Sequence, residues 1–178
     1  MTASVSPAGR LFPQAGVEPV AVRRAFAHYP SGVVALVSET GGELTGMVAS
    51  SFTVGISADP PLVSVAIQRT STSWPRLHDA ARIGVSVFSA DQEGLARQMA
   101  GPDRAARFTG VDLVEDRSEA RFILGAAGWF DCILYDEVPA GDHTIALLEV
   151  VGVQADPKKS PMVFHASSFR QMIPAEGE

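Results

Sequence analysis

A succession of short segments, in which β-branched or aromatic residues alternate with polar ones, constrains the fold of this chain more than any other feature. Such alternation predicts β-strands with one buried face. Glycine, proline or polar turns separate the segments, and the Gly41-Gly42 pair predicts a tight hairpin between the first two. The predicted strands cover residues 32–39, 43–56, 62–68, 82–89, 129–138, 143–154 and 161–169.

Helical spacing occurs in three shorter stretches. These predicted helices cover residues 17–30, 71–82 and 91–101. In the second, Pro75 suits the first turn of a helix, and either Ser73 or Thr72 is expected to cap it. Strands that outnumber a few short helices favour a closed antiparallel β-barrel over a doubly wound parallel sheet. We therefore expect a mainly β fold.

The chain of 178 residues is long enough to bury one hydrophobic core. Residues 1–17 mix Ala, Pro, Gly and Ser without periodicity and are expected to form a mobile arm, and the same is expected of residues 174–178. No linker, repeat or low-complexity tract interrupts the rest of the sequence. We expect a single domain over residues 18–173.

The formal net charge of -6, from 14 basic and 20 acidic residues, argues against a basic nucleic-acid-binding face. No apolar run approaches the roughly 20 residues that a membrane-spanning helix needs, and the first residues lack the order of a signal peptide. A cytoplasmic protein with no nucleic-acid or membrane partner is expected. Cys132 is the single cysteine, so no intrachain disulfide can form, and its apolar neighbours predict a buried strand thiol.

Motifs of several enzyme classes are absent. The sequence has no G-x-G-x-x-G after a strand, no G-x-x-x-x-G-K and no G-x-S-x-G, which argues against a Rossmann site, a P-loop and a hydrolase nucleophile elbow. The four histidines do not have the spacing of metal ligands. We therefore expect no metal site.

Residues 46–65 place hydroxyl and small side chains within a run that otherwise has the pattern of a buried strand. Ala49, Ser50, Ser51 and Phe52 would let a flat ring approach closely and would supply donors and acceptors to its polar edge. The alternative is that these serines face solvent or satisfy neighbouring backbone groups.

A cluster of hydroxyls before the second predicted helix suits a phosphate group. The hydroxyls of Ser71, Thr72 and Ser73 and the free N–H groups of a helix start favour an anion, and Arg107 would add a guanidinium. Helix capping alone also explains these hydroxyls. His143 stands where a loop returns to a strand, a position at which a histidine is either functional or merely structural.

Five motifs occur in the order found in one known family. They are GMVASSF, ADPPLV, TSTSWP, ARFTGV and AGDHT, and an FHASSF segment follows near the end. Over about residues 20–170 the chain resembles the short-chain flavin reductases that serve two-component flavin-dependent monooxygenases. The resemblance implies an FMN-binding split β-barrel, antiparallel and Greek-key-like, with a few short flanking helices.

The resemblance also implies a reaction and partners. NADH or NADPH would transfer a hydride to FMN or FAD, and the reduced flavin would diffuse to a partner monooxygenase. Because hydride transfer is chemistry of the two cofactors, no strong general acid or base is required of the protein. A homodimer is expected, with the flavin in a groove near the subunit interface. The rival hypotheses are a non-catalytic flavin or haem carrier and a flavin enzyme that keeps its cofactor.

Residues around the flavin ring are assigned by their position in these motifs. The resemblance implies that Ala49, Ser50, Ser51 and Phe52 line the isoalloxazine ring and that Phe169 lies near it. Phe169 stands where the family has Tyr, so this contact would pack apolar surface instead of donating a hydroxyl.

The other end of the ligand is assigned in the same way. Ser71, Ser73 and Arg107 would hold the flavin phosphate, and His143 would be the catalytic residue that contacts the nicotinamide. Val48 replaces a Thr that is common in the family, which removes one possible hydrogen bond to the flavin.

Overall fold

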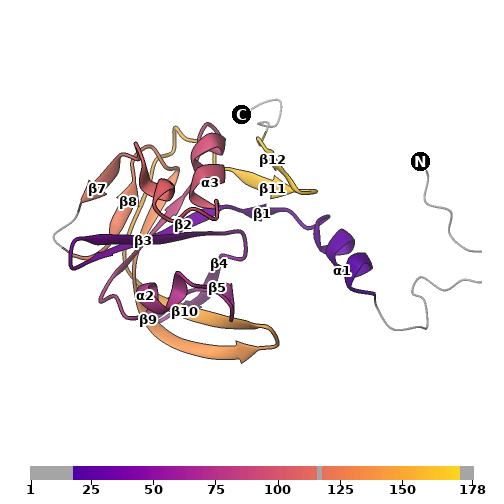
Figure 1. The fold of residues 1–178 in the computed structure, drawn as a ribbon, viewed down its shortest axis with the longest axis horizontal. Helices are drawn as coiled ribbons and strands as arrows, with labels where there is room; N and C mark the ends of the chain where they lie inside the picture. Colours follow the sequence, from indigo (N-terminus) through magenta and orange to yellow (C-terminus); the bar gives the residue numbers. More distant parts are fainter. Residues whose placement is uncertain (1–17, 116–117, 173–178) are drawn as a thin grey trace, which may run out of the picture.

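The structure, a computed structural model, describes residues 18–115 and 118–172. Its main sheet has seven strands in the order β3-β2-β6-β9-β10-β5-β4, and all neighbouring strands are antiparallel (Figure 1). The predicted mainly β, antiparallel architecture is confirmed. The strands are β2 (Val34–Thr40), β3 (Glu43–Ala49), β4 (Thr53–Ala58), β5 (Pro61–Gln68), β6 (Ile83–Val87), β9 (Gly128–Ala140) and β10 (His143–Ala155).

Two smaller sheets and short helices flank the main sheet. The strands of the smaller sheets are β1 (Ser31–Gly32), β11 (Val163–His165) and β12 (Ser168–Arg170) in one, and β7 (Leu113–Glu115) and β8 (Arg121–Ile123) in the other. The helices are α1 (Pro19–Phe26), α2 (Trp74–His78), α3 (Glu93–Met99) and the 3-10 helix η1 (Ala106–Phe108). The three predicted helices all occur, each shorter than its predicted range. Within the described residues no helix has the length and apolar character needed to cross a bilayer.

Domain bounds stay a prediction. The arm expected over residues 1–17 and the residues after 172 lie outside the described part of the chain. The described residues share strands, sheets and buried clusters from residue 31 to residue 170, which suits one domain over this range.

The prediction of one strand over residues 43–56 is wrong, because this segment forms two strands at opposite edges of the main sheet. β3 ends at Ala49 and β4 begins at Thr53, so a short turn carries the chain from one edge to the other. The Ser51 hydroxyl donates to the Ala66 carbonyl at 2.8 Å and accepts from the Ala66 N–H at 3.2 Å. It thereby bonds β5 beyond the part that pairs with β4. Strand periodicity does not report such a turn, since it depends on the partner edge.

Hairpin turns were predicted where glycine marks them and missed elsewhere. Gly41 and Gly42 have φ of +62° and +82°, which confirms the tight β2–β3 hairpin. The predicted strand over residues 161–169 is instead the β11–β12 hairpin, with Ala166 and Ser167 at φ of +50° and +58°. Alanine and serine rarely adopt this conformation, so composition did not indicate a turn. β7 and β8 are too short to show periodicity and were also missed.

Buried residues form two clusters on opposite faces of β2. Val34 and Leu36 belong to the cluster inside the curved main sheet, whereas Ala35 and Val37 pack with residues of α3 and β8. Burial on both faces explains why this strand is a continuous apolar run instead of an alternating one. Cys132 lies in the first cluster, and burial raises the pKa of its thiol to about 12. The predicted buried thiol is confirmed.

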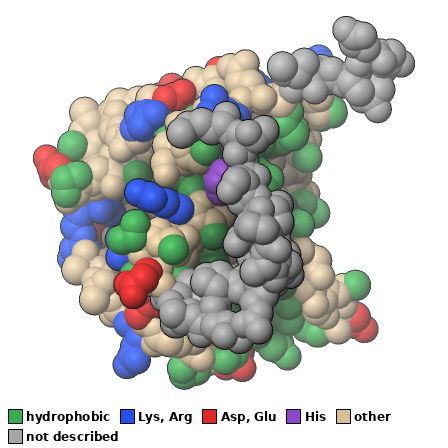
Figure 2. All heavy atoms as spheres, turned by 90° about the vertical axis from the view of Figure 1, so that its right-hand side faces the viewer, with side chains coloured by type: hydrophobic (Ala, Val, Ile, Leu, Met, Phe, Trp, Pro, Cys, Tyr) green, Lys and Arg blue, Asp and Glu red, His purple; other side chains and the backbone are tan. Residues whose placement is uncertain are grey.

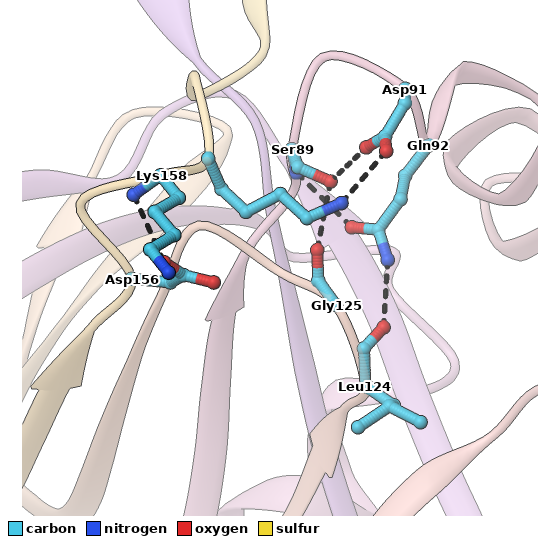
Figure 3. Close-up of polar contacts among 8 residues, drawn as sticks. Ser89, Asp91, Gln92, Leu124, Gly125, Asp156 and Lys158 are labelled. Atoms are coloured by element: carbon cyan, nitrogen blue, oxygen red, sulfur yellow. Dashed lines mark hydrogen bonds and ion pairs between the residues drawn. The ribbon is translucent and has the colours of Figure 1, made fainter.

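Polar contacts hold the loop before α3 against the segment that follows β8 (Figure 3). The Ser89 hydroxyl lies 2.9 Å from the Gly125 carbonyl oxygen and also contacts the Asp91 carboxylate. Lys159 forms an ion pair with Asp91 at 2.8 Å. Hydrogen bonds from Lys159, and to a smaller degree from Ser89, hold the pKa of Asp91 below its ordinary value. Ser89 is buried but the ion pair is exposed, so the serine is expected to contribute more to stability.

We expect Ser89→Ala to lower the free energy of unfolding by about 1–2 kcal/mol, because the Gly125 carbonyl loses its donor. Lys159→Ala should cost about 0.5 kcal/mol or less. Because the pKa of Asp91 is lowered, its contribution is present above its unfolded pKa, near 3.8, and is lost as the pH falls through the folded value. Urea unfolding across this pH range measures both variants. A larger cost at neutral pH for Lys159→Ala would contradict the ranking.

Candidate functional site

A groove of about 480 Å³ opens where the end of β3, the end of β5, α3 and the start of β10 meet. It brings together seven of the nine side chains that the resemblance assigns to ligand contacts, although their segments are far apart in the chain. These are Ala49, Ser50, Ser51, Ser71, Ser73, Arg107 and His143. Their placement in one groove suits a common site, and their individual roles stay predictions.

Phe52 and Phe169 are not among the residues that line this groove. Phe52 packs on the core of the curved sheet, with its ring centroid 5.6 Å from that of Phe130. Phe169 packs against Phe164 at 5.4 Å, and the Arg97 guanidinium lies 4.8 Å from its ring centroid. The structure therefore uses both rings in packing, and does not bring them to the groove wall. Their contact with the flavin ring stays a prediction, since motif position does not give side-chain direction.

Strand pairing positions His143 on the groove. β10 begins at His143, directly after the turn at Gly141-Asp142, and His143 lies opposite Gln68 at the end of β5. The hydroxyl-rich loop of residues 70–73 follows Gln68 almost at once, so two strand ends deliver the histidine and the hydroxyls to the same place. Gly141, with φ of +63°, supplies the backbone conformation that this short hairpin needs.

Arg107 is held by three acceptors at one end of the groove. Its Nε donates to the Gly101 carbonyl at 3.0 Å, and its Nη1 donates to the Gly46 carbonyl at 3.0 Å and to the Ser73 hydroxyl at 2.9 Å. Among the described residues Nη2 has no acceptor, which leaves two donors for an anion. η1 approaches β3 closely because Gly46 has no side chain, since a Cβ there would lie 2.7 Å from Cζ of Phe108.

Ser71 and Ser73 use their hydroxyls differently. Ser73, one of the two predicted caps, is the N-cap residue of α2, but its hydroxyl makes no capping hydrogen bond. Ser71 Oγ instead accepts from the Trp74 N–H at 3.2 Å. With that N–H taken and none on Pro75, the start of this short helix has little left to offer an anion. The buried Ser73 hydroxyl accepts from Arg107, which leaves its own O–H free to donate to a ligand.

His143 is paired with its neighbour Asp142. Its Nδ1 lies 2.6 Å from Asp142 Oδ1, and the His143 side chain is partly exposed to the groove. The hydrogen bond from His143, and then its charge, lower the pKa of Asp142. Nδ1 of His143 is therefore occupied by the Asp142 carboxylate. The other nitrogen has no hydrogen-bond partner in the described part of the chain, so it is available to position a ligand.

The charge of the groove differs from that of the chain. No Asp or Glu is among the described residues that line it, although the chain has 20 acidic residues. Arg107 supplies a permanent positive charge beside hydroxyl donors. The hydroxyl side chains are Ser50, Ser51, Thr70, Ser71, Thr72 and Ser73. This composition favours an anionic, hydrogen-bonding ligand.

Sequence reasoning missed part of the groove. Gln68 lines the groove because β5 pairs with β10 in a register that places it opposite His143. This register was not predicted from the sequence. Met99 and Ala100 come from the end of α3, where a methionine and an alanine read as ordinary helix core. Val48 lines the groove and offers no hydroxyl there. The described residues hold no group of three or more His, Cys, Asp or Glu side chains arranged for a metal ion.

Residues 26–172 match the model of the flavin reductase like domain. The chain belongs to this family. The resemblance drawn from the five motifs is thereby confirmed, and so is the split-barrel fold, since solved flavin reductases share it with this chain.

Individual relatives have similar lengths and names. A flavin reductase of Pseudomonas putida is 31% identical over 157 residues, which cover 88% of this chain and 91% of that protein. The NADH:FAD oxidoreductase of Streptomyces globisporus C-1027, solved with NAD and FAD fragments, has a TM-score of 0.83 at 33% identity and covers 92% of this chain and 99% of its own. The reductase component of 4-hydroxyphenylacetate 3-monooxygenase from Thermus thermophilus is 29% identical, over 86% of this chain and 96% of that protein.

Replacement of Ser51 by alanine removes the hydroxyl that bonds both backbone groups of Ala66. We expect this variant to lower the free energy of unfolding by about 1–2 kcal/mol. Ser50→Ala should change it by less than about 0.5 kcal/mol, because Ser50, which is exposed like Ser51, makes no hydrogen bond to a described residue. Chemical denaturation of the matched pair measures the difference. Equal effects would show that Ser51 does not hold the two sheet edges together.

Proposed function

We propose that this chain is an NAD(P)H-dependent flavin reductase, which transfers a hydride from NADH or NADPH to FMN or FAD. The observation that carries the proposal is the groove without carboxylates, which has Arg107 and hydroxyls at one end and His143 at the start of β10. Membership of the flavin reductase family supports it. So does the Streptomyces globisporus relative, whose name specifies NADH and FAD.

The residues present fit a flavin that carries a phosphate. Arg107 and Ser73 would hold the phosphate, since one offers unused N–H donors and the other a free hydroxyl proton. The small side chains of Ala49 and Ser50 would let the ring approach the groove wall. When bound, the flavin and the nicotinamide supply the hydride chemistry. The protein would orient both ligands, with His143 at the nicotinamide, and would offset the phosphate charge.

We further propose that reduced flavin leaves the groove and supplies a partner monooxygenase in the cytoplasm. The Thermus thermophilus relative is named as the reductase component of such an enzyme, which supports a monooxygenase partner. A reductase of this kind needs no acid or base to act on the oxygenase substrate, which agrees with the lack of carboxylates in the groove.

A homodimer is also part of the proposal. α1 projects from the barrel and has no buried residue, and Phe26 and Tyr29 at its end are largely exposed (Figure 1). On the edge strand β4, Val54 and Ile56 are exposed as well. Figure 2 shows hydrophobic side chains along the right-hand border of the face on this side of the molecule, with Lys and Arg gathered on the left. A helix and an edge strand that bury so little apolar surface are suited to a second copy.

NADH consumption by the purified protein tests the reductase activity. We expect oxidation that depends on added FMN or FAD and continues for many turnovers. A coloured protein that does not oxidise NADH or NADPH would instead indicate a flavin or haem carrier. Tight flavin that reduces a small substrate without release would indicate an enzyme that keeps its cofactor. Crossing both flavins with both nicotinamides gives the preference for each.

Arg107→Ala tests the phosphate contact. We expect it to raise the Kd of FMN by about 10–100-fold, because charge-assisted hydrogen bonds contribute about 1.5–3 kcal/mol, and the effect should be larger at low salt. Riboflavin has no phosphate, so its Kd should change by less than about twofold. Calorimetric titration measures both ligands, and an unfolding curve of the variant reports any loss from the Gly46 and Gly101 contacts. An equal loss of riboflavin affinity would contradict the assignment.

A further inference from the structure

A second hollow, of about 440 Å³, adjoins the groove at its phosphate end. It lies between the start of β3, α2 and the segment around η1, and we call it the arginine hollow, after Arg76, Arg104 and Arg107. Ser73 and Arg107 line both the groove and the arginine hollow. The two spaces therefore share a border at the residues that would hold the flavin phosphate.

The arginine hollow is strongly positive for this chain. Its three arginines face a single carboxylate, that of Glu43, among the described residues that line it. The chain as a whole has a net charge of -6. Gathering like charges is unfavourable unless an anion offsets them, so this composition indicates an anionic ligand.

Two of the three guanidinium groups remain available to such a ligand. Arg104 donates to the Thr72 carbonyl on the groove side, and among the described residues it has no carboxylate partner. Arg76 pairs with Glu43, but the side chains are 51% and 67% exposed, so the pair is weak and readily exchanged. Arg107, by contrast, is fixed by three acceptors at the border between the two spaces.

We propose that the arginine hollow binds the adenylate half of FAD and so makes the chain prefer FAD to FMN. The inference rests on the proposed function, which assigns the first flavin phosphate to Ser73 and Arg107. FMN ends at that phosphate, whereas FAD continues through a second phosphate to adenosine. Arg104 and Arg76 line the space beyond Arg107 and would bind the second phosphate. Phe108 also lines the hollow and would pack against the adenine ring.

A nicotinamide dinucleotide also carries phosphates and adenine, so the same chemistry has a second source. We assign the arginine hollow to FAD because it shares its border with the flavin phosphate residues. His143, the predicted nicotinamide contact, lines the groove and does not line the arginine hollow.

The test measures the Kd values of FAD and FMN by calorimetry with the full chain and its variants. Wild-type protein should bind FAD more tightly than FMN. Arg104→Ala and Arg76→Ala should each raise the Kd of FAD by about tenfold and that of FMN by less than twofold, as expected for the loss of one charge-assisted contact. Arg170→Ala is the matched control, because this exposed arginine of β12 lies outside both spaces, and it should change neither.

A gain of affinity provides a second readout that loss of folding cannot mimic. Glu43→Gln removes the carboxylate that competes for Arg76 and should lower the Kd of FAD by about two- to fivefold while leaving FMN unchanged. A Glu43→Gln variant that binds FAD no better than wild type would count against the inference.

Other outcomes separate this inference from the proposed function. Equal rises in the Kd of FMN and FAD for Arg104→Ala and Arg76→Ala, or equal affinity of the wild type for both flavins, would overturn the inference alone. The inference would also be overturned if Arg104→Ala and Arg76→Ala left the Kd of FAD constant and raised the KM of NADH or NADPH, measured with FMN as acceptor. That result would assign the arginine hollow to the nicotinamide dinucleotide. Wild-type protein that binds neither flavin would overturn the proposed function as well.

Discussion

The turn between β3 and β4 is the constraint on which the rest of the structure depends. It carries the chain from one edge of the seven-stranded sheet to the other, and the Ser51 hydroxyl bonds the backbone of Ala66 across that gap. A hydroxyl serves here because it offers both a donor and an acceptor to β5, whose pairing with β4 has ended. The same turn, with Ala49 and Ser50, forms one wall of the groove. The same turn therefore both closes the barrel and forms part of the site.

Electrostatics sets the groove apart from the remaining surface. No Asp or Glu is among the described residues that line the groove, although Asp142 pairs with His143 there. Three acceptors fix Arg107, so a positive group is in place without reorganising. The arrangement binds and orients anionic ligands and contains little that would transfer protons. Such a division of labour suits a reaction in which two cofactors do the chemistry. In such a protein, the position of further charged residues, such as those of the arginine hollow, sets which ligand binds preferentially.

Much of the architecture could be predicted because local signals agree with the final fold. The Gly41-Gly42 pair adopts the backbone that a tight hairpin requires, and alternation located the long strands of the main sheet. Failures occurred where local and tertiary requirements differ. Ala166 and Ser167 form a turn that their residue types do not favour, and nothing in the pattern of residues 43–56 marks the break after Ala49. Phe52 lies in the same motif as Ser51, yet it packs on the core.

The sequence by itself determined the antiparallel strands, the family and the segments that meet at the groove, because hydrophobic alternation, turn residues and motif order are local properties of the chain. Only the tertiary structure decided which polar groups are free for a ligand. Ser71 is occupied by the Trp74 N–H, whereas Ser73 keeps its proton beside Arg107. The arginine hollow likewise joins three distant segments, since η1 can pack on β3 only where Gly46 leaves room. Contacts of this kind depend on packing between elements, which spacing along the chain does not encode.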